Sequence, residues 1–113
     1  MKIFNLSRGA GKTMRMLYAS EYHNVPILCA TSASKKYIMD MAKWKSINIP
    51  EPIIVSEVTD GRIRGKKIKD ILVDDMESVF RQMLAQYALN MIGGTITIDK
   101  EVSNGQENKS INI

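Results

Sequence analysis

The sequence predicts an α/β fold, in which a sheet of mostly parallel strands carries helices on both faces. Strand-like and helix-like segments alternate along 113 residues, a length that suits one domain. Two strand-like segments, 25–31 and 68–74, contain nearly continuous apolar runs, which are typical of strands buried on both faces. Polar residues follow several predicted strands, at the edge where such sheets bind ligands.

The first half of the chain predicts two strand–helix units. Residues 2–6 form a short apolar-rich strand, and the apolar positions after it predict a helix over 13–22. Residues 25–31 form the second strand. Ser32 or Ser34 caps the next helix, because a serine hydroxyl accepts a hydrogen bond from the first helical turn. The apolar side of that helix carries Tyr37, Ile38 and Met41, flanked by Ala42 and Trp44.

The second half predicts further strands and one long helix. Two prolines within 49–52 end the preceding helix, and residues 53–55 begin a short strand. The apolar residues 71–73 mark a buried strand that ends at Asp74, and the clearest amphipathic helix follows over 76–90. The apolar face of this helix consists of Met76, Val79, Phe80, Met83, Leu84, Tyr87 and Ala88.

The chain ends with a predicted strand and a polar segment. Residues 95–98 alternate threonine and isoleucine, which is typical of a strand. Residues 100–113 are polar and predict a flexible tail. The expected order is therefore β-α-β-α-β-β-α-β, with Asp60-Gly61 as a turn between two neighbouring strands.

Composition narrows the classes of protein that are possible. Residues 1–73 carry thirteen Lys and Arg against six Asp and Glu, whereas residues 74–113 carry three against six. The basic part suits a polyanionic ligand such as a nucleotide or nucleic acid, although charge also serves solubility. The single cysteine, Cys29, excludes an intramolecular disulfide. No apolar run reaches the roughly 18 residues of a membrane span, and Ser7-Arg8 come too soon for a secretory signal, so we expect a cytoplasmic protein without membrane contact.

The segment from Ser7 to Thr13 has the residue types of a phosphate-binding loop, the Walker A motif. Gly9 and Gly11 let backbone N–H groups approach phosphate oxygens, and the following helix directs its positive end at the anion. Lys12 is placed to neutralise the β- and γ-phosphates, and Thr13 to bind Mg²⁺ through its hydroxyl. The alternative is a strand–helix turn rich in small residues. The predicted nucleotide-binding residues are Ser7, Arg8, Gly9, Ala10, Gly11, Lys12 and Thr13.

An acidic pair closes the predicted strand at 71–73. Asp74 lies at the strand end, as the acidic residue of a Walker B motif does, where it can hold Mg²⁺ directly or through water. Asp75 is placed to orient or deprotonate the attacking water, so Lys12 and Asp75 are the predicted catalytic residues. The alternative is that Asp75 or Glu77 only caps the helix that follows.

A basic segment precedes this strand. Five cations fall within eight residues, namely Arg62, Arg64, Lys66, Lys67 and Lys69. Such a cluster suits a nucleic-acid backbone, a partner protein or the phosphate of a neighbouring subunit. A solvated charged loop is the alternative.

The loop and the acidic pair resemble those of the additional-strand, catalytic-glutamate division of P-loop NTPases, which includes helicases and viral DNA-packaging terminases. Ala30-Thr31-Ser32 and Arg64-Gly65 resemble further segments of these ATPase cores. The resemblance implies a three-layer P-loop sheet over residues 1–99, with the last strand between the first and the third. It also implies that a polar residue near Thr97 or Asp99 senses the γ-phosphate.

We expect a minimal nucleotide-binding core of this kind. Residues 1–99 would bind ATP or GTP with Mg²⁺, and hydrolysis would be weak or partner-dependent. The family usually has glutamate where this chain has Asp75, and glycine where it has Leu6. Nucleic acid, a larger protein machine and a second copy of the chain are the candidate partners. The alternative is a non-catalytic interaction or inhibitor protein that keeps the P-loop fold and docks on a larger machine.

Overall fold

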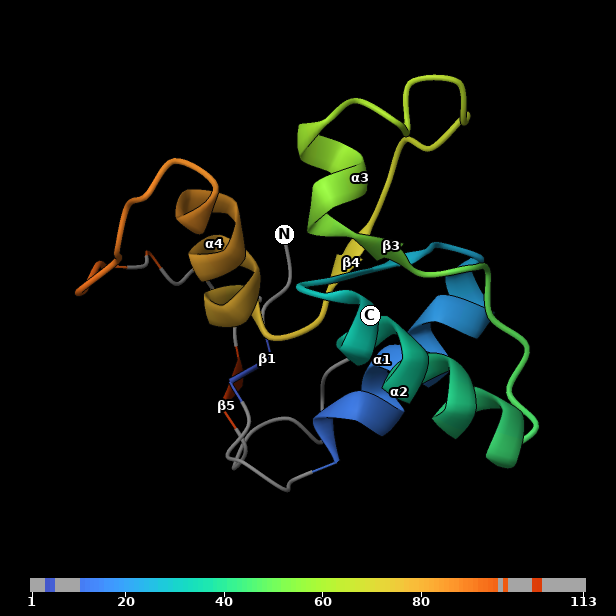
Figure 1. Ribbon diagram of the computed structural model, residues 1–113. Helices are drawn as coiled ribbons and strands as arrows, with labels where there is room; N and C mark the ends of the chain where they lie inside the picture. Colours follow the sequence, from blue (N-terminus) through green and yellow to red (C-terminus); the bar gives the residue numbers. More distant parts are fainter. Residues whose placement is uncertain (1–3, 6–10, 96, 98–102, 105–113) are drawn as a thin grey trace.

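The computed structural model describes residues 4–5, 11–95, 97 and 103–104 of the chain. The described part is an α/β protein with four helices and two small parallel sheets (Figure 1). The helices are α1 (Lys12–His23), α2 (Ser32–Trp44), α3 (Val55–Thr59) and α4 (Met76–Ala85). The strands are β1 (Phe4–Asn5), β2 (Ile27–Cys29), β3 (Ile53–Ile54), β4 (Leu72–Val73) and β5 (Ser103–Asn104).

The three-stranded sheet has the order β3-β2-β4, and both outer strands run parallel to β2. Leu28 pairs with Ile53 on one side and with Val73 on the other, and all three side chains belong to one hydrophobic core. Ile27 and Cys29 point to the opposite side and belong to a second core. The strand is therefore apolar throughout because each of its residues is buried in one core or the other.

Helices supply the other half of each core. Leu17 of α1 and Ile38 of α2 pack on one side of β2. Val55 of α3 and Val79 of α4 pack on the other side, against Leu28. Figure 1 shows α1 and α2 together on one side of the strands, with α3 on the opposite side. Each helix buries a stripe rather than its whole surface, which fits the amphipathic patterns in the sequence.

Helix α3 lies where the sequence predicts the end of a strand and a loop, so the strand prediction over 53–55 is wrong at Val55. Two β-branched valines in this segment favour a strand locally. The structure instead turns into a helix because Glu57 Oε1 accepts a hydrogen bond from the backbone N–H of Ile54 at 3.1 Å, and because Val55 is 1% exposed in the core. With α3, a helix follows each of the first four strands.

Helix α4 is shorter than predicted, because it ends at Ala85 rather than near residue 90. Ala88 has φ of 57°, in the left-handed region, so the chain has left the helical conformation there. Phe80 is 50% exposed and Tyr87 is 71% exposed, so the predicted apolar face is wrong at these positions. Val79 is the position of this helix that is buried in the core.

The last strand in the described part of the chain is β5 at 103–104, whereas the sequence predicts a strand at 95–98. It pairs in parallel with β1, through Phe4 opposite Ser103. Thr95 and Thr97 lie outside any strand, and residues 96 and 98 fall outside the described part of the chain. Alternation alone did not locate this strand because pairing depends on the partner strand and its register. Apart from 103–104, the predicted tail lies outside the described residues.

Glu57 also joins an ion-pair network that links α2, α3 and the loop after α3. Its carboxylate lies 4.0 Å from Lys35 Nζ and 3.5 Å from Lys66 Nζ, and its side chain is 14% exposed. The hydrogen bond from the N–H of Ile54, aided by the two lysine charges, lowers the pKa of Glu57 below 4.5. The ionised carboxylate therefore stabilises the fold above its unfolded-state pKa, and this contribution is lost as pH falls through the lower folded-state pKa.

We therefore expect Glu57→Ala to lower the free energy of unfolding at pH 7 by about 1–2 kcal/mol, as loss of a helix cap does. The difference from the wild type should shrink below about pH 4, where carboxylates become protonated. Urea unfolding at pH 7 and pH 3 measures both effects. The control Glu51→Ala removes a carboxylate that is 68% exposed and 2.8 Å from Lys35, and it should change stability by less than about 0.5 kcal/mol. Equal effects of the two substitutions would contradict the capping role.

Candidate functional site

The described part of the predicted phosphate loop is its last three residues, Gly11, Lys12 and Thr13. Gly11 has φ of 78° and ψ of 21°, the left-handed region in which glycine is favoured. Its carbonyl accepts the first helical hydrogen bond, from the N–H of Arg15 at 3.1 Å. Lys12 and Thr13 therefore lie in the first turn of α1. The remaining predicted loop residues, Ser7, Arg8, Gly9 and Ala10, lie outside the described residues.

The predicted acidic pair follows β4 directly. The N–H of Asp74 donates to the carbonyl of Leu28 at 3.2 Å, which continues the contact between the two parallel strands by one residue. Asp75 then has φ of 58° and ψ of 78°, so the chain turns sharply before α4. Aspartate and asparagine adopt this left-handed conformation more readily than other residues with a side chain.

Asp75 also caps α4, which confirms the capping role considered for it. Its Oδ1 accepts from the backbone N–H of Ser78 at 3.4 Å, and its Oδ2 accepts from Ser78 Oγ at 2.8 Å. Asp75, and not Glu77, makes these capping contacts. The Glu77 carboxylate pairs instead with Arg81 Nε at 3.0 Å. The same Asp75 carboxylate is thus fixed in orientation and still 43% exposed.

Lys12 reaches this acidic pair from a distant part of the sequence. Lys12 Nζ lies 3.9 Å from Asp75 Oδ2, and both side chains are 43% exposed. Burial raises the pKa of Asp74, the Lys12 charge lowers it, and the Asp75 charge raises it further, with a net rise. Lys12, Asp74 and Asp75 therefore act on one another electrostatically, at the start of α1 and the carboxyl end of β4.

The segment after β2 contributes a third strand end. Thr31 Oγ1 accepts from the backbone N–H of Ser34 at 3.2 Å and lies 3.1 Å from Ser34 Oγ. Thr31, rather than Ser32 or Ser34, therefore caps α2, which corrects the prediction. The reason is its extended backbone, with φ of −137°, because an N-cap residue stands outside the helix with its hydroxyl facing the first turn.

The basic segment forms a series of turns after α3. Arg62 Nε lies 3.0 Å from Asp60 Oδ2, and Lys66 Nζ lies 3.5 Å from Glu57 Oε2. Carboxylates of the same region therefore offset two of these five cations. The other three, Arg64, Lys67 and Lys69, are exposed.

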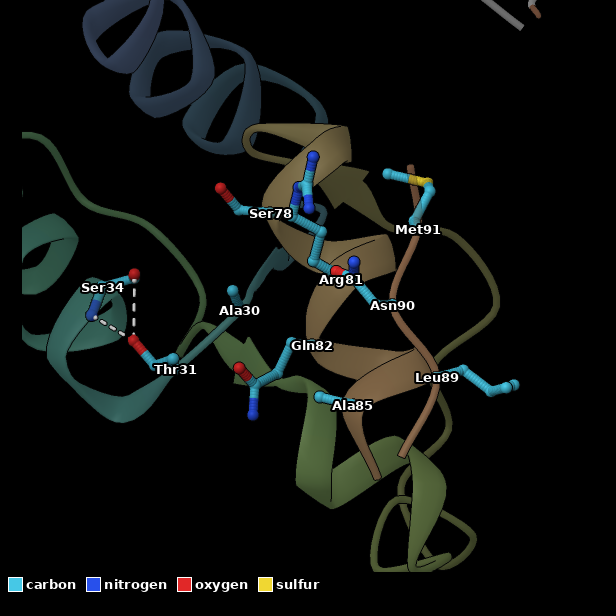
Figure 2. Close-up of a pocket in the computed structure, with 10 residues that line it drawn as sticks. All are labelled: Ala30, Thr31, Ser34, Ser78, Arg81, Gln82, Ala85, Leu89, Asn90 and Met91. Atoms are coloured by element: carbon cyan, nitrogen blue, oxygen red, sulfur yellow. Dashed lines mark hydrogen bonds between the residues drawn. The ribbon is translucent and has the colours of Figure 1, made fainter. Parts of the chain in front are cut away.

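A pocket of about 470 Å³ lies between the start of α2 and α4 (Figure 2). The apolar positions of α4 do not indicate this pocket, because its lining comes mostly from small and polar side chains. The available signal is the i, i+4, i+7 spacing of Ser78, Gln82 and Ala85, a small and polar stripe beside the apolar one. The pocket is lined by Ala30, Thr31, Ser34, Ser78, Arg81, Gln82, Ala85, Leu89, Asn90 and Met91.

Two predicted features remain outside this site. Asp99 lies outside the described residues, and Thr97 is exposed.

Among the described residues, no three His, Cys, Asp or Glu side chains form a group able to hold a metal ion. None of the helices described is both long and apolar enough to cross a membrane. Comparison of the chain with protein-family models, curated proteins and solved structures finds no match.

Proposed function

We propose that this protein binds a nucleoside triphosphate, ATP or GTP, together with Mg²⁺, and hydrolyses it weakly or only with a partner. The observation that carries the proposal is the 3.9 Å approach of Lys12 Nζ to Asp75, with Asp74 beside it at the end of β4. A lysine after a glycine-containing turn and an acidic pair after a buried strand are the two halves of a phosphate and Mg²⁺ site.

The charges at the start of α1 support an anionic ligand. The first turn of α1 holds no acidic residue, and its first residue is Lys12. The positive end of the helix dipole lies at the N-terminus. A cation there is therefore unfavourable, whereas an anion is favoured. A phosphate would be stabilised by the helix N–H groups and by the Lys12 ammonium group together.

The acidic pair suits a metal ion that is bound with phosphate. Mg²⁺ is usually held by one or two carboxylates together with substrate phosphates and water. Asp74 is the carboxylate best placed for this role, because a nearby dication would stabilise its charged form against the cost of burial. Thr13, in the first turn of α1, would supply the hydroxyl ligand.

The strand order supports a more detailed proposal about the sheet. We infer a three-layer P-loop sheet of the additional-strand, catalytic-glutamate division over residues 1–99 and the strand at 103–104. The parallel pairing of β1 with β5 supports this inference, because in that division the last strand lies beside the first; the described strands β3, β2 and β4 form a separate sheet. The strand that ends at Asp74 lies beside β2, which also fits.

Calorimetry with ATP and with GTP, each with and without Mg²⁺, tests the proposal. We expect at least one triphosphate to bind about tenfold more tightly with Mg²⁺ because Asp74 and Thr13 then share the ion with phosphate. Asp74→Asn should remove this gain, and it should raise the melting temperature of the free protein by roughly 2–4 °C because it removes an ionised group that burial disfavours. Asp70→Asn, at an exposed carboxylate before β4, is the matched control. Negligible binding in every condition would refute the proposal and favour a non-catalytic interaction or inhibitor protein.

Nucleic acid is a second candidate ligand, favoured by the basic segment. Arg64 and Lys67 are exposed, and no ion pair to either is seen in the described part of the chain. Reversing both charges should leave the melting temperature unchanged and should weaken single-stranded nucleic-acid binding. The slope of log affinity against log salt should become shallower by roughly 1–2, as expected for two lost phosphate contacts. Lys43→Glu, at an exposed lysine of α2, is the control. If wild-type protein binds no nucleic acid at low salt, a protein partner is the better candidate.

A further inference from the structure

The pocket between α2 and α4 holds side chains for which the nucleotide proposal has no use. Figure 2 shows Ser78 and Gln82 extending from α4 toward Thr31 and Ser34 at the start of α2. Its volume of about 470 Å³ lies in the range of ligand-binding sites. We propose that this pocket binds an extended segment of a partner protein that carries one acidic side chain beside an apolar one.

The hydrogen-bonding groups in the pocket differ in whether they are already used. Thr31 and Ser34 are bonded to each other, and Ser78 donates to Asp75. Among the described residues, the carboxamides of Gln82 and Asn90 make no side-chain hydrogen bond. A carboxamide presents a donor and an acceptor in one plane, and these complement the C=O and N–H of a peptide group. Gln82 and Asn90 can therefore bind the main chain of an extended segment.

The charges around the pocket favour a single carboxylate over a polyanion. Among the described residues that line the pocket, Arg81 is the only charged one, and Glu77 Oε2 lies 3.0 Å from its Nε. Asp75, bonded to Ser78 of the lining, places a second carboxylate near the pocket. Nucleic-acid backbones need several cations along their path, whereas one guanidinium group can bind one carboxylate through two parallel hydrogen bonds. An acidic side chain is the better match.

The chain that leaves α4 supplies the apolar part of the site. Leu89, which lines the pocket, is 58% exposed, and Ile92 is 93% exposed. Met91 lines the same pocket and adds a flexible apolar side chain. Exposed apolar side chains beside a polar pocket are typical of protein-binding sites. An apolar residue next to the acidic one in the partner would cover them.

Ser78 connects this pocket to the proposed nucleotide site. Its hydroxyl lines the pocket and also donates to Asp75 Oδ2 at 2.8 Å. A bound segment that engages Ser78 would change how firmly Asp75 is held, which gives a physical route to partner-dependent hydrolysis. This coupling rests on the proposed function, whereas binding of the peptide segment does not.

An array of capped hexapeptides tests the proposal directly. Each acidic peptide carries one central Asp or Glu flanked by Leu or Ala, and each has a matched peptide with Asn or Gln in its place. We expect the wild-type protein to bind the best Leu-flanked acidic peptide at least tenfold more tightly than its amide match. The double variant Gln82→Ala with Asn90→Ala, and separately Arg81→Gln, should each lower that affinity at least tenfold. Glu77→Gln should raise it, because the competing carboxylate is removed.

Gln86→Ala is the matched control, because Gln86 is exposed at the end of the same helix and outside the pocket lining. All variants change exposed or half-buried side chains, and melting curves check that they fold. The proposal is overturned if no peptide binds the wild type more tightly than the double variant. It is also overturned if a single-stranded oligonucleotide, rather than a peptide, shows the dependence on Gln82 and Asn90. Peptide binding by wild-type protein that binds neither ATP nor GTP would refute the proposed function and support this site.

Discussion

Lys12→Ala is expected to weaken binding of the Mg²⁺–triphosphate complex about 100-fold while leaving the melting temperature almost unchanged. Two charge-assisted contacts to phosphate, each worth about 1.5 kcal/mol, account for a loss of this size. The folded protein loses little, because the Lys12–Asp75 pair is 3.9 Å long and 43% exposed on both sides. Alanine is also the best helix former, and it removes a cation from the positive end of α1.

Lys43→Ala, at an exposed lysine near the end of α2, is the matched control and should change neither property. Calorimetry measures the affinity, and circular dichroism measures the melting temperature on the same samples. If Lys12→Ala unfolds the protein, Lys12 has a structural role and the phosphate assignment is wrong. If the affinities of both variants equal that of the wild type, the triphosphate binds elsewhere.

The approach of Lys12 to Asp75 could be anticipated because both residues follow strands of a predicted parallel α/β sheet. The carboxyl ends of parallel strands meet at one edge of the sheet, so polar residues after such strands are brought together. The apolar run around Leu28 located β2 correctly, because both faces of that strand are covered. These predictions rested on burial, which is a strong and local signal in the sequence.

Other features depend on contacts that a single sequence does not display. Helix α3 depends on one side-chain cap from Glu57 and on the burial of Val55, against the local preference for a strand. The place of β5 depends on its register with Phe4 of β1. Phe80 stands at a helical spacing that matches the core, yet it is 50% exposed, because the side of α4 that faces the core is the one with Val79 and Met83. In each case tertiary packing selects among local alternatives that the sequence leaves nearly equal.

Turnover by the isolated protein is expected to be slow, and to depend on Asp75. Its carboxylate accepts two hydrogen bonds from Ser78 and lies beside Lys12, so it is restrained rather than free to approach a water. A general base must lie within about 3 Å of the proton that it takes. Asp75→Asn should therefore reduce the remaining hydrolysis by at least about 100-fold, the usual contribution of a general base. Triphosphate affinity should stay within about twofold, because the Lys12 and Asp74 contacts to phosphate and metal remain.

The fold should tolerate this substitution, because asparagine caps helices about as well as aspartate and also adopts positive φ. Asp75→Glu should keep or raise the rate, since the longer side chain reaches past Ser78, but it should lower stability by about 1 kcal/mol through loss of the cap. Phosphate release under single-turnover conditions, with melting curves on the same variants, separates these effects. Fast hydrolysis by the wild type that is unchanged in Asp75→Asn would show that another residue activates the water. In that case the Ser78 contacts mean that Asp75 serves α4 as a cap and takes no part in the reaction.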